Sequence, residues 1–226
     1  MKRFIRKKVK IMEQKQTLFE QALKSYNLPK KQEAVLLASL HLFAEQGYEA
    51  TSSSQIAARA QVAEGSVYRH FKTKRGILEV ILSSITDELL PRMSEEFITE
   101  LKGQTGLDFQ DFLTYLVHNR LEFLVENQLQ IKILLQETGS NPQYLKVLVD
   151  KFHDVIDTSI WHIFDHYKKQ GRLVDWDVMR IFTYVAWAIL SAALPYIYLP
   201  AQPFDIDQKT KEISEFLVKG LTPGKL

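Results

Sequence analysis

Residues 51 to 74 read Thr51-Ser-Ser-Ser-Gln-Ile-Ala-Ala-Arg-Ala-Gln-Val-Ala-Glu-Gly-Ser-Val-Tyr-Arg-His-Phe-Lys-Thr-Lys74. This stretch contains two short helical patterns, and the few residues between them leave room only for a tight turn. The first pattern opens with Ser52, which together with Gln55 fits a capping box, where two side chains satisfy the free amides at a helix start. Two short helices joined in this way predict a helix-turn-helix.

The second pattern has one apolar and one polar face. Val67 and Phe71 stand four residues apart and are expected to face the core. The side chains left to face outward are those of Ser66, Tyr68, Arg69, His70, Lys72 and Lys74. Such a face, which carries no carboxylate, can donate hydrogen bonds to phosphate oxygens and reach base edges in a major groove. Gly65, just inside this helix, allows close approach of a backbone or a phosphate. The alternative is a solvated basic helix on a small core.

The stretch resembles the DNA-binding domain of the TetR family of bacterial transcriptional regulators. The resemblance runs from about Gln32 to Leu78, is most specific in residues 65–74, and is supported by Phe43-Ala-Glu-Gln-Gly-Tyr48 and Ile56-Ala57. It implies that DNA contacts come from Ser53, Gly65, Ser66, Tyr68, Arg69, His70 and Lys74. It further implies that Tyr68 and Lys74 anchor phosphates, whereas Arg69 and His70 influence the choice of sequence.

The sequence departs from that family's pattern at two positions in the turn. Gln61 stands where the family often has glycine, and Ala63 stands where it usually has a serine cap. Loss of the cap is expected to cost roughly 0.5–2 kcal/mol of local stability. Glu64 recovers part of this, because a carboxylate at a helix start interacts favourably with the helix dipole.

The composition is that of an ordinary soluble globular protein. The 226 residues are 46% hydrophobic and 25% charged, which is enough for one large domain or two small ones with a core. There are no cysteines. The composition therefore excludes disulfides and thiolate metal sites.

The net charge of +2 hides a strong asymmetry along the chain. Residues 1–75 hold 15 Lys and Arg against 6 Asp and Glu, whereas residues 76–226 hold 14 against 21. Part of the basic excess comes from the first ten residues, but an excess remains without them. A basic first third joined to an acidic remainder predicts polyanion binding at one end.

The amino-terminal residues 1–30 are expected to form a basic extension. They contain no apolar core of the kind that a signal peptide needs. Three interpretations stay open: a basic arm that touches DNA, a solvated leader, or an upstream extension with Met12 as the natural start. We expect a DNA-binding domain over residues 31–76 and a helical effector-binding and dimerisation domain over residues 77–226.

The whole chain is predicted to be all-α, because it contains no alternating strand pattern and no Asn-Gly hairpin signal. Thr73 is a plausible N-cap for the helix expected over residues 74–90. Pro91 is expected to end or kink that same helix. The expected helices cover residues 31–46, the two patterns within 51–74, 74–90, 108–127, 128–138, 141–169, 175–199 and 206–220.

Residues 181–199 carry no charge, so a membrane span has to be considered. Thr183, Ser191 and Pro195, the flanking acidic residues and the lack of a second span speak against it. A buried or dimerising helix has the same composition. In TetR-like proteins the last two long helices form the dimer interface, and residues 175–199 and 206–220 occupy that place in the order.

No catalytic motif supports an enzyme. There is no phosphate-binding glycine loop, no G-x-S-x-G and no H-E-x-x-H. A metal site can be considered around His153, His162 and His166 together with Asp154, Asp157 and Asp165. Two histidines spaced i, i+4 on a long amphipathic helix are more often surface or pocket residues, so we expect neither a metal nor a cofactor.

The acidic part carries many aromatic residues on apolar helices, with polar groups on or near the same faces. Ligand sites are mostly apolar concavities with a few placed polar groups, although the same aromatics can simply fill a core. Taken as a set, and with the resemblance, they predict a small-molecule pocket. The candidate effector-binding residues are Phe112, Tyr115, His118, Asn119, Phe123, Trp161, His162, Tyr184 and Trp187.

These observations together predict a cytoplasmic, homodimeric regulator without a membrane segment. We expect it to bind a near-palindromic operator in double-stranded DNA, to act as a repressor and to be released by a small-molecule effector. Two alternatives remain open: an all-α interaction protein whose basic end binds an acidic protein or a membrane surface, and a single-span membrane protein.

Overall fold

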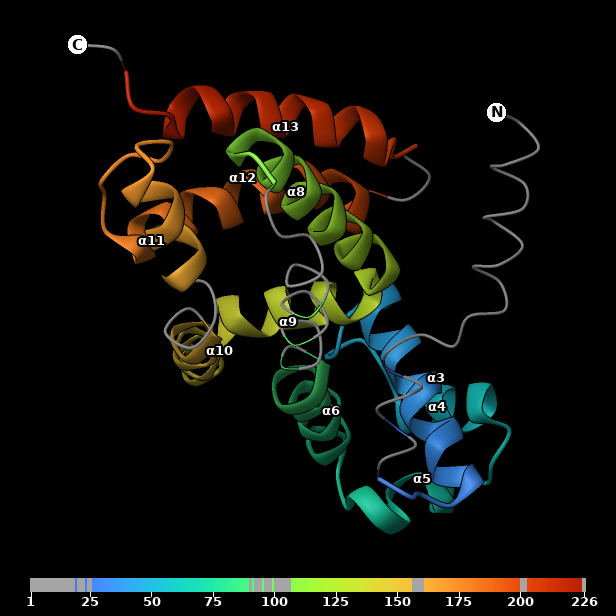
Figure 1. Cartoon of the computed structure of the whole chain (residues 1–226). Helices are drawn as coiled ribbons and strands as arrows, with labels where there is room; N and C mark the ends of the chain where they lie inside the picture. The colour runs from blue at the N-terminus through green and yellow to red at the C-terminus, as the bar shows by residue number, and fades with distance from the viewer. Residues whose placement is uncertain are drawn as a thin grey trace. The chain divides into compact units, whose positions relative to one another are not determined.

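Every element of the computed structural model is helical within the part of the chain that it describes, which confirms the all-α prediction (Figure 1). The structure describes Phe19, Leu23, residues 26–89, Pro91, Glu95, Thr99 and residues 107–155, 161–199 and 203–224. The helices are α3 (Lys30–Gln46), α4 (Ser53–Ala60), α5 (Glu64–Phe71), α6 (Lys74–Ser83), η1 (Ser84–Leu89), α8 (Phe109–Glu126), α9 (Gln128–Ser140), α10 (Pro142–Val155), α11 (Trp161–Lys169), α12 (Val178–Tyr198) and α13 (Ile206–Leu221). The chain divides into two compact units, Met1–Ile85 and Thr86–Leu226.

The first unit is built around α3, which packs against α4, α5 and α6. Each of the four helices contributes at least one side chain that is almost fully buried. Among the least exposed are Leu36, Phe43, Ile56, Val67, Ile77, Leu78 and Ile81, together with Phe19 and Leu23 from upstream of α3. Burial of each such side chain contributes about 1.5–3 kcal/mol. The apolar spacing seen in the sequence therefore fixes which face of α4 and of α5 points inward.

The helix expected over residues 74–90 changes character part of the way along. The α-helical part, α6, ends at Ser83, and the chain continues as the π-helix η1 to Leu89. The boundary between the two units falls inside η1, between Ile85 and Thr86, and not after residue 76 where the sequence places it. The reason is that α6 packs against α3 and α5, so it belongs with them.

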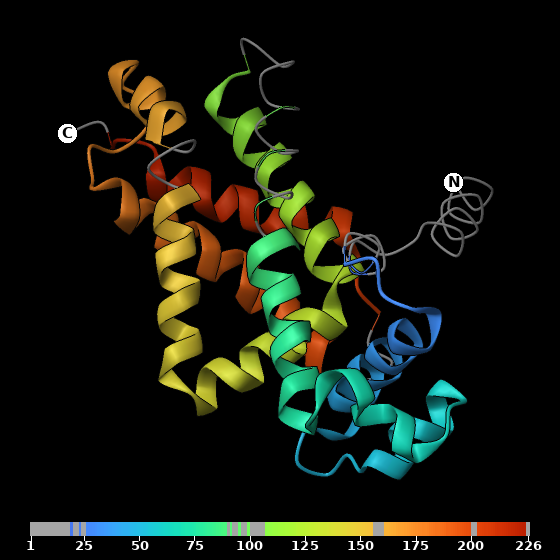
Figure 2. The same cartoon turned by 90° about the horizontal axis from the view of Figure 1, so that it is seen from below.

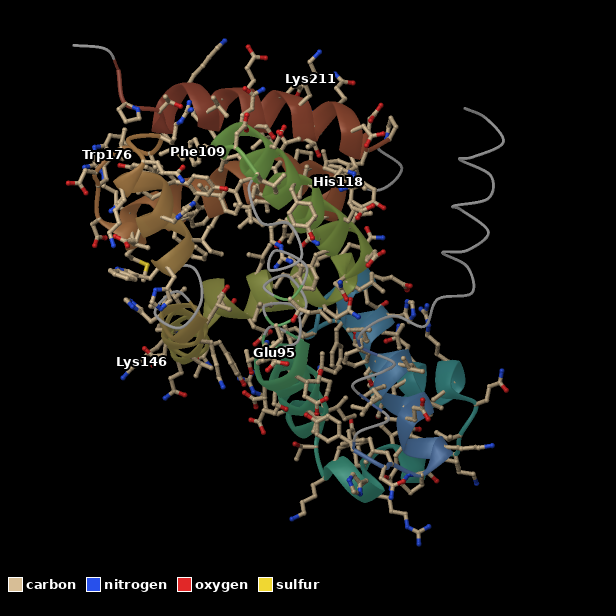
Figure 3. The ribbon with its side chains drawn as sticks, in the orientation of Figure 1. Glu95, Phe109, His118, Lys146, Trp176 and Lys211 are labelled. Atoms are coloured by element: carbon tan, nitrogen blue, oxygen red, sulfur yellow. The ribbon has the colours of Figure 1, made fainter. Side chains whose placement is uncertain are left out.

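The second unit is organised around α8, α12 and α13. In both views α13 lies along α8 and α12 (Figures 1 and 2), and the three helices contact one another pairwise. Their facing side chains form one hydrophobic cluster, which includes Leu113 and Leu121 of α8, Ile181 of α12 and Leu217 of α13. Side chains on the outer surface, such as Lys211 of α13, project away from this core (Figure 3).

The prediction of one helix over residues 141–169 is wrong. Two helices, α10 and α11, occupy that range, and Figure 1 shows α10 along its axis but α11 from the side. Residues 156–160, between them, lie outside the described part. The apolar positions of the two segments share a helical period, which is why the sequence alone suggested a single element.

Among the described helices, α12 is long and apolar enough to cross a bilayer: it has 21 residues, and its most apolar window has a mean hydropathy of 1.5. Only 28% of its most apolar window is buried. The inward face, which includes Ile181, Val185 and Ile189, packs into the hydrophobic cluster of the second unit. A helix that contributes one face to a core passes the same test of length and composition as a membrane span.

Candidate nucleic-acid interface

The start of α4 carries the capping box that the sequence predicted. The Ser52 hydroxyl accepts a hydrogen bond from the Gln55 amide at 3.2 Å, and the Gln55 side chain accepts one from the Ser52 amide at 2.8 Å. Gln46, at the end of α3, donates to the Gln55 side chain at 3.0 Å and to the Thr51 hydroxyl at 3.2 Å. These bonds fix the direction in which α4 leaves the preceding loop.

A second tie between α3 and α4 is an ion pair on the surface. Arg59 of α4 donates from both terminal nitrogens to Glu45 of α3, at 2.7 and 2.9 Å. The Arg59 hydrogen bonds lower the pKa of the Glu45 carboxyl, partial burial opposes this, and the charges of Arg59 and His41 lower it further. The two-point contact holds α4 in a defined orientation on α3.

The turn between α4 and α5 accommodates both departures from the expected pattern. Gln61 adopts the left-handed conformation (φ 55°, ψ 43°), which glycine adopts without a steric penalty. Ala63 is the N-cap of α5 and offers no side-chain hydrogen bond. The turn is held instead by backbone bonds, including Val62 N–H to the Ala57 carbonyl at 3.0 Å.

Helix α5 presents the two faces that the sequence predicted. Val67 is fully buried and Phe71 is nearly so, whereas Arg69 and His70 are exposed. Ser66 and Tyr68 are half-buried at the edge between the two faces. The outer face thus offers hydroxyl, phenol, guanidinium and imidazole groups to solvent.

Gly65 is exposed and uncrowded. A Cβ at this position would meet no atom of the chain within 4 Å. The packing of the chain itself therefore does not require a glycine at this position. The close approach of a group from outside the chain, such as a phosphate, remains the explanation that the sequence predicts.

Glu64, the first residue of α5, was predicted only to interact with the helix dipole, and the structure gives it a further contact. Ser53, a predicted DNA contact, donates its hydroxyl proton to the Glu64 carboxylate at 2.7 Å. The bond links the first turn of α4 to the first turn of α5. The signal in the sequence was the position of Glu64 at the start of the second helix, where residues of a helix-turn-helix reach base edges.

The junction between α5 and α6 is tight. Lys72 has a positive φ of 61°, and the Thr73 amide bonds to the Phe71 carbonyl at 2.7 Å, which makes a γ-turn. Thr73 then caps α6, as predicted, by accepting from the Gly76 amide at 2.9 Å. A Cβ on Gly76 would lie 2.2 Å from the Phe71 carbonyl oxygen, so this position requires glycine.

Lys74, predicted as a phosphate anchor, points into its own unit. Its ammonium donates to the carbonyls of Tyr48 at 2.9 Å, Glu49 at 3.3 Å and Thr51 at 3.0 Å. The same nitrogen lies 4.4 Å from the centre of the Tyr48 ring. Of the seven predicted contacts, the structure thus brings Gly65, Ser66, Tyr68, Arg69 and His70 together on α5, and it engages Ser53 and Lys74 within the unit.

The nine candidate effector residues do not converge in the second unit. Phe112 and Phe123 are buried, and the Phe112 ring packs 5.1 Å from that of Tyr167. His118 lies near Glu122 and Asp207, Asn119 accepts from Arg120, Tyr115 packs against the hydrophobic cluster, and Trp161, His162, Tyr184 and Trp187 are exposed. His118 borders a surface groove of about 590 Å³ between α8 and α13, and Trp161 borders one of about 320 Å³ beside α11.

In the described residues no three His, Asp or Glu side chains lie close enough to hold a metal ion. The side chains of Asp154 and Asp157, considered with the three histidines, fall outside the description. His166 instead contacts the Gln170 amide at 2.9 Å.

Helix α12 has an exposed apolar stripe opposite its buried face. We call this the α12 stripe: Tyr184, Trp187, Ser191, Pro195 and Tyr198. Trp187 is 60% exposed, Tyr184 48% and Tyr198 39%. On α13, Phe216 is 67% exposed. Soluble proteins rarely leave such a row of large apolar side chains uncovered, and larger patches of this kind mark interaction surfaces.

Comparison with known proteins gives one family for the first unit. Residues 35–81 match the sequence model described as bacterial regulatory proteins, tetR family. An HTH-type transcriptional repressor of Mycobacterium tuberculosis is 41% identical over 63 residues, which are 28% of this chain and 34% of the relative. Matched segments cover 26–60% of the length of curated relatives of this kind.

Solved structures resemble nearly the whole chain in fold. The FadR regulator of Bacillus subtilis, solved in complex with stearoyl-CoA, has a TM-score of 0.62 at 22% identity and covers 83% of this chain and 97% of its own. A transcriptional regulator from Saccharomonospora viridis, solved in complex with choline, has a TM-score of 0.64 at 19% identity and covers 85% and 98%. At these identities the likeness concerns the fold.

Proposed function

We propose, from the premise that this chain belongs to the tetR family of bacterial regulatory proteins through residues 35–81, that it is a DNA-binding transcriptional regulator. The observation that carries the proposal is the geometry of α5. Its buried side chains Val67 and Phe71 fix its orientation on α3, and the opposite face carries only groups suited to phosphates and base edges.

We assign roles on this face by chemistry and position. Tyr68, at the edge of α5, suits a phosphate oxygen, whereas Arg69 and His70 are exposed donors for base edges. Ser66 and Gly65 lie in the first turn, where the backbone can come close to the duplex. Glu64 adds an acceptor, and the matching group in a major groove is the cytosine amino group.

The regulator acts as a dimer in this proposal, with the α12 stripe as its interface. The stripe is symmetric about Ser191: Tyr184 and Tyr198 stand seven residues to either side, and Trp187 and Pro195 stand four to either side. In a two-fold interface the same patch must match itself. An antiparallel crossing at Ser191 would stack Trp187 on Pro195 of the second copy and pair Tyr184 with Tyr198.

A dimer explains how a short helix could select an operator. Two α5 helices placed about 34–36 Å apart would enter successive major grooves on one side of the duplex. The operator is then a near-palindrome with half-sites about one helical turn apart. A relative of the chain is named a repressor, and we propose the same sign of regulation, in the cytoplasm, for this chain.

A small-molecule effector would bind the second unit. Two regulators with this fold have been solved with stearoyl-CoA and with choline, so the fold hosts chemically unlike ligands. The effector shifts the equilibrium only if it binds one arrangement of the dimer better than the other. The matching test is thermal unfolding with panels of acyl-CoA thioesters and quaternary amines: an effector should raise Tm and weaken operator binding.

The experiment that tests DNA recognition is selection of genomic fragments by the purified full-length protein, followed by titration of the recovered site. We expect a near-palindromic site that is bound far more tightly than a scrambled duplex of equal length. Equal affinity for both duplexes at about 0.15 M salt, where non-specific binding is weak, would refute sequence-specific regulation.

A further inference from the structure

The ammonium of Lys74 sits in a pocket made of backbone. Three carbonyls, those of Tyr48, Glu49 and Thr51, accept its protons at 2.9–3.3 Å, and the Tyr48 ring covers a further side at 4.4 Å. A lysine ammonium has three N–H donors and no acceptor. All three donors are therefore committed inside the unit.

The loop that supplies these carbonyls is itself braced. Thr51 is only 2% exposed, and its hydroxyl donates to the Gly47 carbonyl at 2.8 Å. Its amide bonds to the Tyr48 carbonyl at 3.2 Å, and the Tyr48 ring packs edge-on against Phe43 at 5.2 Å. The carbonyls are thus held in place around the cation. That of Tyr48 also accepts from the Thr51 amide, whereas Lys74 satisfies those of Glu49 and Thr51, which would otherwise need water.

The Lys74 contact links two parts of the chain that lie on either side of the helix-turn-helix. Thr51 stands just before α4, and Lys74 is the first residue of α6, just after the turn that follows α5. The ammonium therefore joins the two ends of the helix-turn-helix. Residues 51–74 and this contact form a closed loop of chain, which we call the ring. A cation in the first turn of a helix opposes the helix dipole, so the contact with the carbonyls has to compensate for an unfavourable position.

We infer that Lys74 is a positioning residue for α5 and not a phosphate ligand. The inference rests on the proposed function, because it concerns how the helix is presented to DNA. With the ring closed, α5 stays in one orientation on α3. With the ring open, only a fraction of molecules holds that orientation, and the apparent affinity for DNA falls with this fraction.

The test compares Lys74→Met, Lys74→Arg and the control Lys72→Met in the full chain. Lys72 is exposed on the outward face two residues away, so Lys72→Met removes the same charge from a side chain that the loop carbonyls do not hold, and it shows what an outward lysine contributes to affinity and to the slope. Operator affinity is measured from low to high salt, at a temperature at which far-UV circular dichroism shows each variant to be folded. A protein that loses one phosphate contact loses about 0.9 from the slope of log K against log salt.

We expect Lys74→Met to bind operator at least about ten-fold more weakly than wild type, because losing a hydrogen bond to a charged group changes an equilibrium constant by about ten-fold or more. Its slope of log K against log salt should equal that of the wild type. Lys74→Arg should not restore affinity, since a planar guanidinium cannot direct its protons to three carbonyls around one point. A slope lower by about 0.9 that Lys74→Arg restores would identify a phosphate anchor and overturn the inference. Wild-type affinity in folded Lys74→Met would reduce the residue to a stabilising role and overturn it as well.

A measurement without DNA separates this inference from the proposed function. Amide exchange at residues 48–52 should speed up in Lys74→Met and not in Lys72→Met, because only the first variant releases the carbonyls of that loop. Unchanged exchange in both variants would overturn the inference. If the wild-type protein binds no DNA duplex while amide exchange in the two variants changes as expected, the proposed function fails and the ring closure stands.

Discussion

At the scale of single residues, two glycines on neighbouring helices have opposite surroundings. A Cβ on Gly76 would lie 2.2 Å from the Phe71 carbonyl oxygen, whereas a Cβ on Gly65 would meet nothing. Gly76→Ala should therefore lower the free energy of unfolding, by about 1–3 kcal/mol, because backbone must move. Gly65→Ala should raise it by about 0.5–1 kcal/mol, because alanine is the better helix former. Urea unfolding with unchanged m-values measures both effects.

The Gly65→Ala substitution should also change stability and operator binding in opposite directions. Gly65→Ala should weaken operator binding although it stabilises the fold, since its methyl group occupies the space that we assign to the duplex. A Gly65→Ala protein that is more stable and binds DNA normally would show that nothing approaches this position.

The Glu45–Arg59 pair predicts a pH dependence. Its hydrogen bonds lower the pKa of the Glu45 carboxyl in the folded state. A depressed pKa contributes stability above the usual carboxyl range, and that contribution is lost as the pH falls through the folded value. Because Glu45 is half-exposed, we expect only about 0.2–1 kcal/mol. Glu45→Gln should lower stability at about pH 7, and its difference from wild type should shrink as the pH falls below the usual carboxyl range; a constant difference would contradict the assignment.

At the scale of elements, the uncapped start of α5 offers a direct gain. Ala63 has the extended backbone of an N-cap, and its carbonyl accepts from the Ser66 amide at 2.8 Å, but its side chain offers no acceptor to the amides of the first turn. Ala63→Ser should therefore stabilise the protein by about 0.5–2 kcal/mol, seen as a higher urea midpoint. Ala63→Val keeps an extended backbone without the hydroxyl and should give no gain. Equal gains from both substitutions would exclude capping as the cause.

Elements that depend on neighbours in the sequence could be predicted, and those that depend on distant contacts could not. The capping box at Ser52 and the cap at Thr73 each join residues three apart, so the sequence contains both ends of the bond. The change from α6 to η1 gives no such local signal. Nor does the division of residues 141–169 into α10 and α11, because the apolar positions of both segments follow a helical period.

The candidate interface shows the same division. The inward positions of Val67 and Phe71 follow from their spacing, and so does the outward face of α5. The destination of the Lys74 ammonium does not, because its acceptors lie more than twenty residues upstream in a loop. The candidate effector residues were predicted from residue type, which does not distinguish a core aromatic such as Phe112 from an exposed one such as Trp187.

At the scale of the whole molecule, the α12 stripe makes assembly testable. Trp187→Glu puts a carboxylate in the most exposed part of the stripe and, in a two-fold dimer, does so twice. We expect a monomer by sedimentation and a large loss of operator affinity, since the second head no longer binds at high effective concentration. The fold should persist, because the side chain is exposed.

A charge-changing control lies on another helix. Lys211 is exposed on α13 and borders the groove that faces α8, so Lys211→Glu should leave both the dimer and operator binding intact. A Trp187→Glu protein that still sediments as a dimer would place the interface elsewhere.

The symmetry of this stripe about Ser191 has a genetic consequence. In the dimer that we propose, each copy offers the same surface that it binds, so a chain with an impaired head and an intact stripe should enter dimers with normal chains as readily as normal chains do with one another. Such a mixed dimer holds only one half-site, so an allele that damages the head should be dominant in a cell that also carries the normal gene. An allele that alters Trp187 should be recessive, since its product no longer captures the normal chain.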